Sequence, residues 1–206
     1  MAEAILAYIT SQTYWGIFVL MVLENVFPPI PSEVILPFVG HLSATGVLSL
    51  PLALFVATLG ALVGTFFWFM IGWFIPVPTL EKFFHRFGGY VAISHKDFKA
   101  ATAFFTRYEA LAVFFGRLIP AVRSVISIPA GCVHMKVTTF IALSTLGATV
   151  WNTLLIGVSY YFLQDYSVIE KYISPVGNGI IGLFIVLYFV QVARFLSQRF
   201  RHKNEL

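Results

Sequence analysis

Long apolar stretches separated by short polar ones dominate the chain. No Asp, Glu, Lys or Arg occurs between Val34 and Leu80, whereas about 20 apolar residues suffice for one helix to cross the hydrocarbon core of a membrane. The pattern therefore predicts an all-α integral membrane protein, with a single polytopic membrane domain over residues 1–206. The expected full membrane spans are residues 48–75, 138–163 and 176–193.

Two further apolar stretches are interrupted by residues that break helices. Proline lacks a backbone N–H and disfavours the helical conformation at the residue before it. Interrupted backbone at membrane depth is tolerated only where protein buries it or water reaches it. We therefore expect residues 24–42 and 110–135 to form re-entrant hairpins, each of which enters and leaves the membrane from one side. The residues expected to keep these hairpins broken are Pro28, Pro31, Pro120 and Gly131.

Basic residues set the expected orientation. They gather in the polar segment 81–109 and in the C-terminal tail 194–206, and the apolar positions of the first segment recur as in an amphipathic helix at a membrane interface. Because cytoplasmic loops carry an excess of Lys and Arg, we expect both segments to be cytoplasmic. The first hairpin then enters from outside and the second from the cytoplasm. A long apolar helix follows each hairpin, which is the layout of an inverted-topology repeat in transporters.

Composition agrees with a membrane protein and narrows its chemistry. Of the 206 residues, 59% are hydrophobic and 11% are charged, compared with about 25% charged residues in soluble domains. The net charge of +4 does not point to a nucleic-acid partner, because the basic residues lie beside apolar spans. Cys132 is the single cysteine, and no His or Cys cluster has the spacing of metal ligands. We therefore expect neither a metal ion nor another cofactor.

Four ionisable residues lie in or beside the predicted hairpins: Glu24, Glu33, Arg117 and Arg123. An Arg, Lys or Asp at the centre of a membrane helix costs about 2.5 to 3.5 kcal/mol, so these groups must pair, face water, or do both. A pair between Glu33 and one of the arginines that only staples the hairpins is one interpretation. A buried ion pair, however, seldom stabilises more than apolar packing of the same volume, and intramembrane charges more often mark a substrate or proton pathway.

The choice of arginine at both positions points to phosphate. A guanidinium group stays protonated and binds phosphate through two parallel hydrogen bonds, whereas lysine is a strongly hydrated point charge. We therefore expect Arg117 and Arg123 to bind a phosphate headgroup. Glu24 and Glu33 would balance their charge or carry protons. The two arginines are six positions apart, so Pro120 is expected to bend the chain and let both guanidinium groups converge on one phosphate.

The hairpin sequences resemble those of the DedA family of bacterial membrane proteins, which shares its domain with eukaryotic VTT, or SNARE-associated, lipid scramblases. ENVFPPIPSE at residues 24–33 is similar to the family motif E-N-x-x-x-P-x-P-[SG]-E. FFGRLIPAVR at residues 114–123 is similar to F-x-G-R-x-x-P-x-x-R. STLGATVWNTLLIGVSYYF at residues 144–162 looks like the family's helix with a Trp-Asn pair. The resemblance covers nearly the whole chain from residue 24 onwards.

The resemblance implies a multi-pass helical protein of the bacterial cytoplasmic membrane with two opposed re-entrant hairpins. It implies movement of a lipid between leaflets, with undecaprenyl phosphate and glycerophospholipids such as phosphatidylethanolamine as candidates, and a part in cell-envelope integrity. The family's functional carboxylates and arginines correspond to Glu24, Glu33, Arg117 and Arg123. The chain departs from the family pattern at Gly64-Thr65, Gly72-Trp73 and Tyr108-Glu109, which leaves the lipid open.

Three functions fit these features. The preferred one is a flippase-like or scramblase-like lipid transporter, not an enzyme, which is either coupled to the proton motive force or independent of it. The second is a membrane phosphatase acting on an isoprenoid pyrophosphate, with nucleophile and base drawn from Ser32, His41, Ser124, Ser127 and His134. The third is a proton-coupled cation transporter. The expected partners are membrane lipids and protons, and the sequence is compatible with a homo-oligomer.

Overall fold

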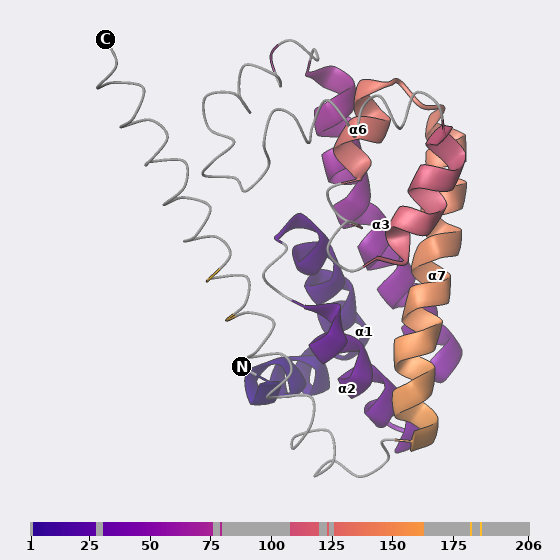
Figure 1. The fold of residues 1–206 in the computed structure, drawn as a ribbon. Coiled ribbons are helices and arrows are strands. Elements are labelled where there is room, and N and C mark those ends of the chain that lie inside the picture. The colour runs from indigo at the N-terminus through magenta and orange to yellow at the C-terminus, as the bar shows by residue number, and fades with distance from the viewer. Residues whose placement is uncertain are drawn as a thin grey trace.

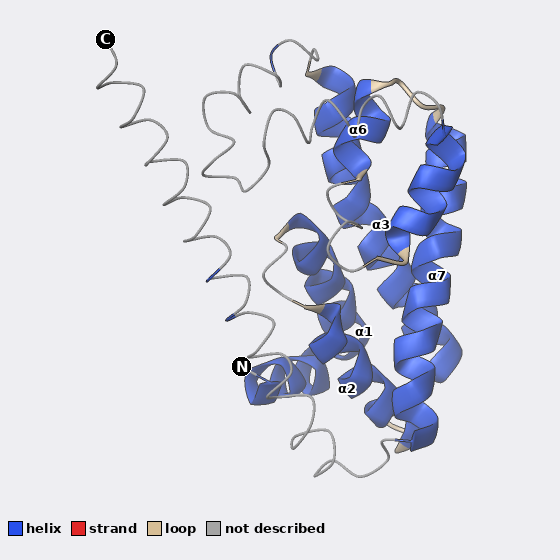
Figure 2. Ribbon diagram, in the orientation of Figure 1, coloured by secondary structure: helices blue, strands red, loops and turns tan. Residues whose placement is uncertain are grey.

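The computed structural model describes residues 2–27, 31–75, 108–119 and 126–162, together with residues 79, 123, 182 and 186. The regular elements in this part of the chain are all helices (Figure 2). They are α1 (Ala2–Val26), α2 (Ser32–Ala44), α3 (Leu50–Phe74), α6 (Ser127–Cys132) and α7 (Val137–Phe162). Residues 108–117 form a further helix, termed the 108–117 helix. The prediction of an all-helical protein is confirmed for the described residues.

The two long apolar helices of the described structure are α3 and α7. They contain 25 and 26 residues, and at about 1.5 Å per residue each is longer than the roughly 30 Å of a bilayer core. By length and composition both are able to cross a membrane, and they coincide with the stretches whose hydropathy predicts spans at 48–75 and 138–163. The other predicted segments, 81–109, 176–193 and 194–206, fall almost entirely outside the described residues.

Small residues let α1 pack closely along α3. A kink at Thr13, whose φ is 54°, divides α1. The segment before the kink lies across one end of the molecule, and the segment after it runs beside α3 (Figure 1). A Cβ atom added to Gly60 would lie 2.6 Å from the Phe18 carbonyl oxygen, and one added to Gly64 would lie 2.7 Å from that of Val22. The GxxxG spacing of these glycines therefore brings the two backbones together.

The chain reverses direction twice near the middle of the molecule (Figure 1). The first reversal comprises the end of α1 and the start of α2. The second reversal comprises the end of the 108–117 helix, residue 123 and the start of α6. The two reversals approach each other from opposite ends of the bundle, so residues that are far apart in the sequence meet at mid-height.

The helix that leaves each reversal packs on the long helix that follows the other reversal. A Cβ atom added to Gly40 of α2 would lie 2.5 Å from the Ile156 carbonyl oxygen and 2.7 Å from the Ser159 Cβ atom, both on α7. Gly131 of α6 meets the backbone of α3 at Gly72, where no Cβ atom fits. Gly131, which we expected to keep a hairpin broken, thus lies inside a helix at a tight helix contact.

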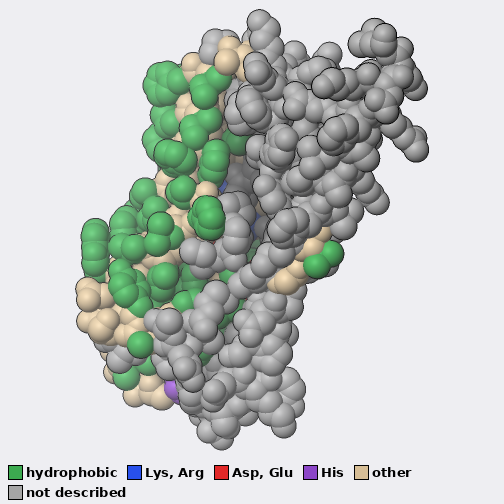
Figure 3. Space-filling view, turned by 90° about the vertical axis from the view of Figure 1, so that its left-hand side faces the viewer, with side chains coloured by type: hydrophobic (Ala, Val, Ile, Leu, Met, Phe, Trp, Pro, Cys, Tyr) green, Lys and Arg blue, Asp and Glu red, His purple; other side chains and the backbone are tan. Residues whose placement is uncertain are grey.

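Hydrophobic side chains cover the long helices on their outer side. Exposed residues recur every four positions along α3 and α7: Phe55, Leu59, Val63 and Phe67, and Leu146, Val150, Leu154 and Val158. On the face drawn in Figure 3, hydrophobic side chains dominate the described surface. An exposed apolar surface of this extent suits contact with lipid chains. Buried apolar residues form two clusters, one around α1 and α2 and one around α6 and the 108–117 helix.

Candidate functional site

The candidate site lies where the two reversals meet. It contains Glu24 from the last turn of α1, Arg117 from the end of the 108–117 helix, and Arg123 from the segment before α6. These residues are only 3%, 4% and 8% exposed, respectively. Because an isolated buried charge is very costly, each of the three side chains needs partners inside the protein.

Helix ends position the two glutamates. Pro31 has an extended backbone, with φ −82° and ψ 129°, and directly precedes α2, so Glu33 falls in the first turn of that helix. A carboxylate at this place interacts favourably with the positive end of the helix dipole. Glu24 lies in the last turn of α1. Pro28 and Pro120 lie outside the described residues, so their expected role in shaping the hairpins stays a prediction.

An ion pair joins the two reversals. The Nη2 atom of Arg123 donates to Oε1 of Glu24, and Oε2 of Glu24 accepts a 2.6 Å hydrogen bond from Nδ2 of Asn25. Both oxygens of this buried carboxylate are therefore satisfied. The stapling interpretation assigned Glu33 to such a pair, whereas in the structure Glu24 pairs with Arg123.

Arg117 is held by hydrogen bonds on both of its terminal nitrogens. Its Nη1 atom donates to Oγ1 of Thr65 over 3.1 Å and to the backbone oxygen of Arg123. Its Nη2 atom donates to Oγ of Ser127 over 3.0 Å and to Oγ of Ser144 over 3.2 Å. The guanidinium group thereby links α3, α6 and α7 to the second reversal.

These contacts close into a ring of hydrogen bonds. Thr65 Oγ1, which accepts from Arg117, is 3.2 Å from Oδ1 of Asn25 and donates to it. Asn25 donates to Glu24, Glu24 accepts from Arg123, and the backbone oxygen of Arg123 accepts from Arg117. Because neighbouring bonds in such a network strengthen one another, the position of each charged group depends on all five members.

Aromatic rings lie against both guanidinium groups. The guanidinium carbon of Arg123 is 5.8 Å from the centroid of the Trp151 ring, and that of Arg117 is 5.5 Å from the centroid of Phe140, within the range of cation–π attraction. Trp151 Nε1 also donates to Oγ of Ser32, the first residue of α2, over 3.3 Å. Trp151 therefore contacts both reversals from α7.

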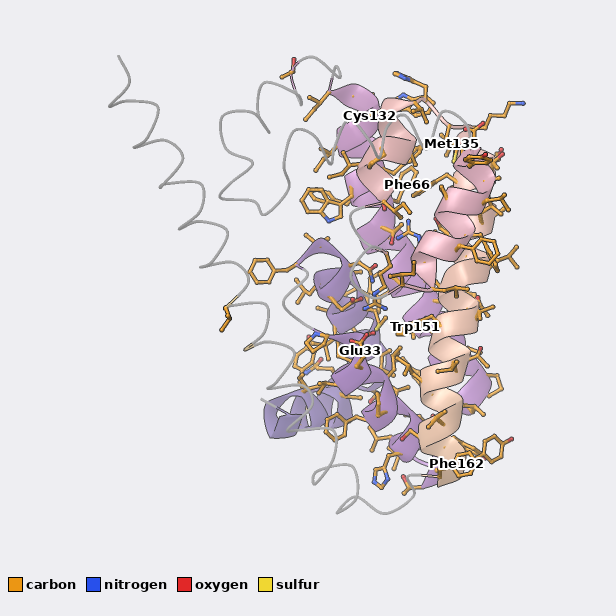
Figure 4. All side chains as sticks on the ribbon, in the orientation of Figure 1. Glu33, Phe66, Cys132, Met135, Trp151 and Phe162 are labelled. Carbon is orange, nitrogen blue, oxygen red and sulfur yellow. The ribbon has the colours of Figure 1, made fainter. Side chains whose placement is uncertain are left out.

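Glu33 stands beside this network without joining it. The residue is partly exposed, and its Oε1 atom is buried with no hydrogen-bond partner among the described residues. Its charge acts on the nearby Glu24 carboxylate. Figure 4 shows Glu33 and Trp151 at mid-height of the molecule, where the reversals meet. Glu33 is thus partly exposed, whereas its unpaired Oε1 atom is buried.

The structure brings three of the four predicted charged residues into direct contact and leaves the fourth beside them. The two arginines are neighbours, since Arg117 bonds to the backbone of Arg123, yet their guanidinium groups have different partners. Sequence reasoning considered Ser127 only as a possible nucleophile. It missed four further polar partners: Asn25, Thr65, Ser144 and Trp151. Each of these residues is a polar side chain within an apolar segment, which is a signal that the sequence does show. The sequence does not show which groups they bond, because the hydrogen bonds of Arg117 join residues up to 52 positions apart.

The site offers guanidinium, carboxylate, amide and hydroxyl groups. Among the described residues, no group of three or more His, Cys, Asp or Glu side chains is placed to hold a metal ion. Nδ1 of His134 lies 3.2 Å from the backbone oxygen of Cys132. The centroid of the His134 ring is 4.9 Å from the centroid of the Trp73 ring. Ser124, one of the hydroxyls considered as a nucleophile, lies outside the described residues.

Comparison with known proteins places the chain in a family. The family model described as the VTT domain matches residues 30–161. A protein of Lactococcus lactis subsp. cremoris named alkaline phosphatase-like protein is 31% identical over 206 residues, which cover 100% of this chain and 96% of that protein. No solved structure matches the chain.

Two further relatives carry the name undecaprenyl phosphate transporter A. The one from Staphylococcus aureus is 32% identical over 203 residues, covering 98% of this chain and 100% of the relative. The one from Bacillus subtilis is 29% identical over 189 residues, covering 90% of this chain and 91% of the relative. The family match and these nearly full-length similarities agree with the buried charged cluster in an apolar helical bundle. The chain therefore belongs to the VTT-domain, or DedA, family of membrane proteins.

Proposed function

We propose that this protein is a transporter that moves an anionic, phosphate-bearing lipid between the leaflets of the bacterial cytoplasmic membrane. The observation that carries the proposal is the buried ion pair of Glu24 and Arg123 at the meeting point of the two reversals. The names of the relatives from Staphylococcus aureus and Bacillus subtilis favour undecaprenyl phosphate as the lipid. A glycerophospholipid such as phosphatidylethanolamine is the second candidate.

The two reversals are proposed to be re-entrant hairpins of an inverted repeat. In each half a helix, a break and a return helix precede a long apolar helix. Glycines at corresponding places let the first helix of each half pack closely on the long helix of the same half. Gly64 of α3 packs against α1, and Gly147 of α7 packs against the 108–117 helix. A Cβ atom added to Gly147 would lie only 2.6 Å from Arg117 Cβ. Gly40 and Gly131 likewise seat the two return helices on the opposite long helices. The hairpins would enter from opposite faces, with the C-terminus in the cytoplasm.

The charged groups of the site have the chemistry that this transport requires. A phosphate headgroup must leave water at mid-membrane, and the arginine-bearing site would replace part of its hydration with charge-assisted hydrogen bonds. Glu24 balances the positive charge while no lipid is bound. Glu33, with its unpaired and buried oxygen, would exchange protons with water. Uptake of protons by the two glutamates would couple lipid movement to the proton motive force.

Phosphatase activity is the second candidate, because the Lactococcus relative is named alkaline phosphatase-like. A serine nucleophile needs a base within hydrogen-bond reach. Oγ of Ser127 and Oγ of Ser144 accept hydrogen bonds from Arg117, and neither hydroxyl is hydrogen-bonded to a His, Asp or Glu base within the described residues. This arrangement favours transport over hydrolysis.

The two candidates are separated by one reconstitution. Purified protein in vesicles that contain a fluorescent polyprenyl phosphate is expected to raise the fraction of probe that a membrane-impermeant quencher reaches, without releasing inorganic phosphate. Vesicles without protein give the baseline. Release of inorganic phosphate from the corresponding polyprenyl pyrophosphate in a parallel sample would instead identify a phosphatase. Probe accessibility equal to that of empty vesicles would contradict the transport proposal.

A further inference from the structure

The hydrogen bonds of the site separate the two arginines. An arginine side chain has five N–H donors, and four of those on Arg117 are used by Thr65, Ser127, Ser144 and the backbone oxygen of residue 123. The fifth, on Nε, is buried and has no hydrogen-bond partner among the described residues. A phosphate that binds bidentately needs two adjacent donors, so it would have to break an existing bond of Arg117.

Arg123 is arranged differently. Within the described part of the chain, its only side-chain hydrogen bond goes to Glu24. A carboxylate and a phosphate both present paired anionic oxygens to a guanidinium fork. A phosphate can therefore take the place of Glu24 on Arg123 while the stacking on Trp151 and the bonds of Arg117 stay in place.

The Glu24 carboxylate keeps a hydrogen-bond partner when it leaves Arg123. Asn25 Nδ2 holds Oε2 of Glu24 at 2.6 Å and also lies 3.0 Å from the Met21 backbone oxygen. Asn25 is in turn bonded to Thr65 and accepts at its backbone oxygen from Trp68 over 3.1 Å. Glu24 therefore keeps its bond to Asn25, which α1 and α3 hold, when Arg123 exchanges its partner.

We propose, on the basis of the lipid transport proposed above, that Arg123 alone binds the phosphate by exchanging Glu24 for it, and that Arg117 is a positioning residue. Arg117 fixes the backbone of residue 123, so it sets where the guanidinium group of Arg123 is presented. Its separate bonds to Ser127 and Ser144 anchor this position to α6 and α7.

The exchange has a consequence for pH dependence. Charged groups that act on Glu24 are Arg123 and Arg117 from the second reversal and Glu33 from α2. A proton on Glu24 removes the anion that competes with phosphate for Arg123, so protonation of Glu24 and phosphate binding favour each other by linkage. Phosphate affinity is therefore expected to fall as rising pH deprotonates Glu24.

The test compares the affinity of purified, detergent-solubilised variants for farnesyl phosphate at a series of pH values, with farnesol as the control that lacks phosphate. Glu24→Gln is expected to bind about tenfold more tightly than the wild type at alkaline pH, since one charge-assisted competitor is lost, and to show a flatter pH profile. The phosphate ester titrates identically in both experiments, so the difference between the profiles isolates Glu24. Arg123→Gln is expected to lose at least about tenfold in affinity.

Ser144→Ala is the matched variant for Arg117, because it frees one Nη2 donor without removing a charge. Under the proposal it lowers the affinity for farnesyl phosphate, by about threefold, because one of the bonds that anchor the position of Arg123 is lost. A gain as large as that of Glu24→Gln would show that the Arg117 fork binds the phosphate, and would overturn the division of roles. An unchanged affinity and pH profile in Glu24→Gln would overturn the exchange alone. Equal binding of farnesyl phosphate and farnesol by the wild type would overturn the proposed function as well.

Discussion

Replacing Arg123 with lysine is expected to reduce lipid transport at least about tenfold, although the positive charge is kept. Lysine offers a strongly hydrated point charge in place of a planar fork, and a hydrogen bond to a charged group contributes about 1.5 to 3 kcal/mol. The substitution also removes the stacking on Trp151. The measurement is the rate at which a fluorescent polyprenyl phosphate crosses the bilayer of proteoliposomes that contain equal amounts of folded protein.

The matched control is Lys136→Gln, which removes an exposed positive charge in the segment before α7. It is expected to transport at the wild-type rate, because no role at the site depends on it. If Arg123→Lys also transports at the wild-type rate, the fork geometry is not needed and phosphate recognition at this residue is contradicted.

Replacing Gly131 with alanine is expected to cause the largest loss of stability among small substitutions in the described helices. The added methyl group would meet the Phe69 carbonyl oxygen and the backbone around Gly72, not flexible side chains. Overpacking of a tight contact costs about 1 to 3 kcal/mol, and a backbone neighbour has little freedom to move aside. Thermal unfolding in detergent measures the loss as a lower midpoint.

Gly157→Ala provides the control, because no atom of a neighbouring element in the described part of the chain lies within 4 Å of a Cβ atom placed there. Alanine has the higher helix propensity, by about 1 kcal/mol, so this variant is expected to unfold at the wild-type temperature or above it. A Gly131→Ala variant as stable as Gly157→Ala would mean that α6 does not pack against α3 as described.

The long helices and the broken segments were readable from the sequence for physical reasons. Uninterrupted apolar runs produce α3 and α7, because such lengths have no other way to satisfy backbone hydrogen bonds in lipid. Pro31, which was expected to keep the first hairpin broken, directly precedes α2. Pro37 and Pro129 lie inside α2 and α6. Pro129 is in the first turn of α6, where a proline removes no hydrogen bond of the helix. Pro37 lies further inside α2, and its carbonyl oxygen accepts a 2.6 Å hydrogen bond from Ser159 of α7.

The charged members of the site could also be predicted from the sequence, because charges are rare in apolar segments. Which of these residues pair with one another could not be predicted. Glu24 pairs with Arg123 across 99 residues of sequence, a separation at which the hydrophobic pattern carries no information on pairing. The roles of Thr65 and Ser144 as acceptors for Arg117 depend on helix packing across 52 and 27 residues. The kink at Thr13, a β-branched residue with φ of 54°, had no signal in the hydrophobic pattern.

The central claim is that a phosphate-bearing lipid binds at Arg123, and native mass spectrometry of the detergent-extracted protein tests it most directly. The wild type is predicted to carry an adduct with the mass of undecaprenyl phosphate or of a phospholipid, and Arg123→Gln, prepared identically, is predicted to lose it. An adduct retained at the same occupancy in Arg123→Gln, or a wild type that carries no phosphate-bearing lipid, would contradict the account.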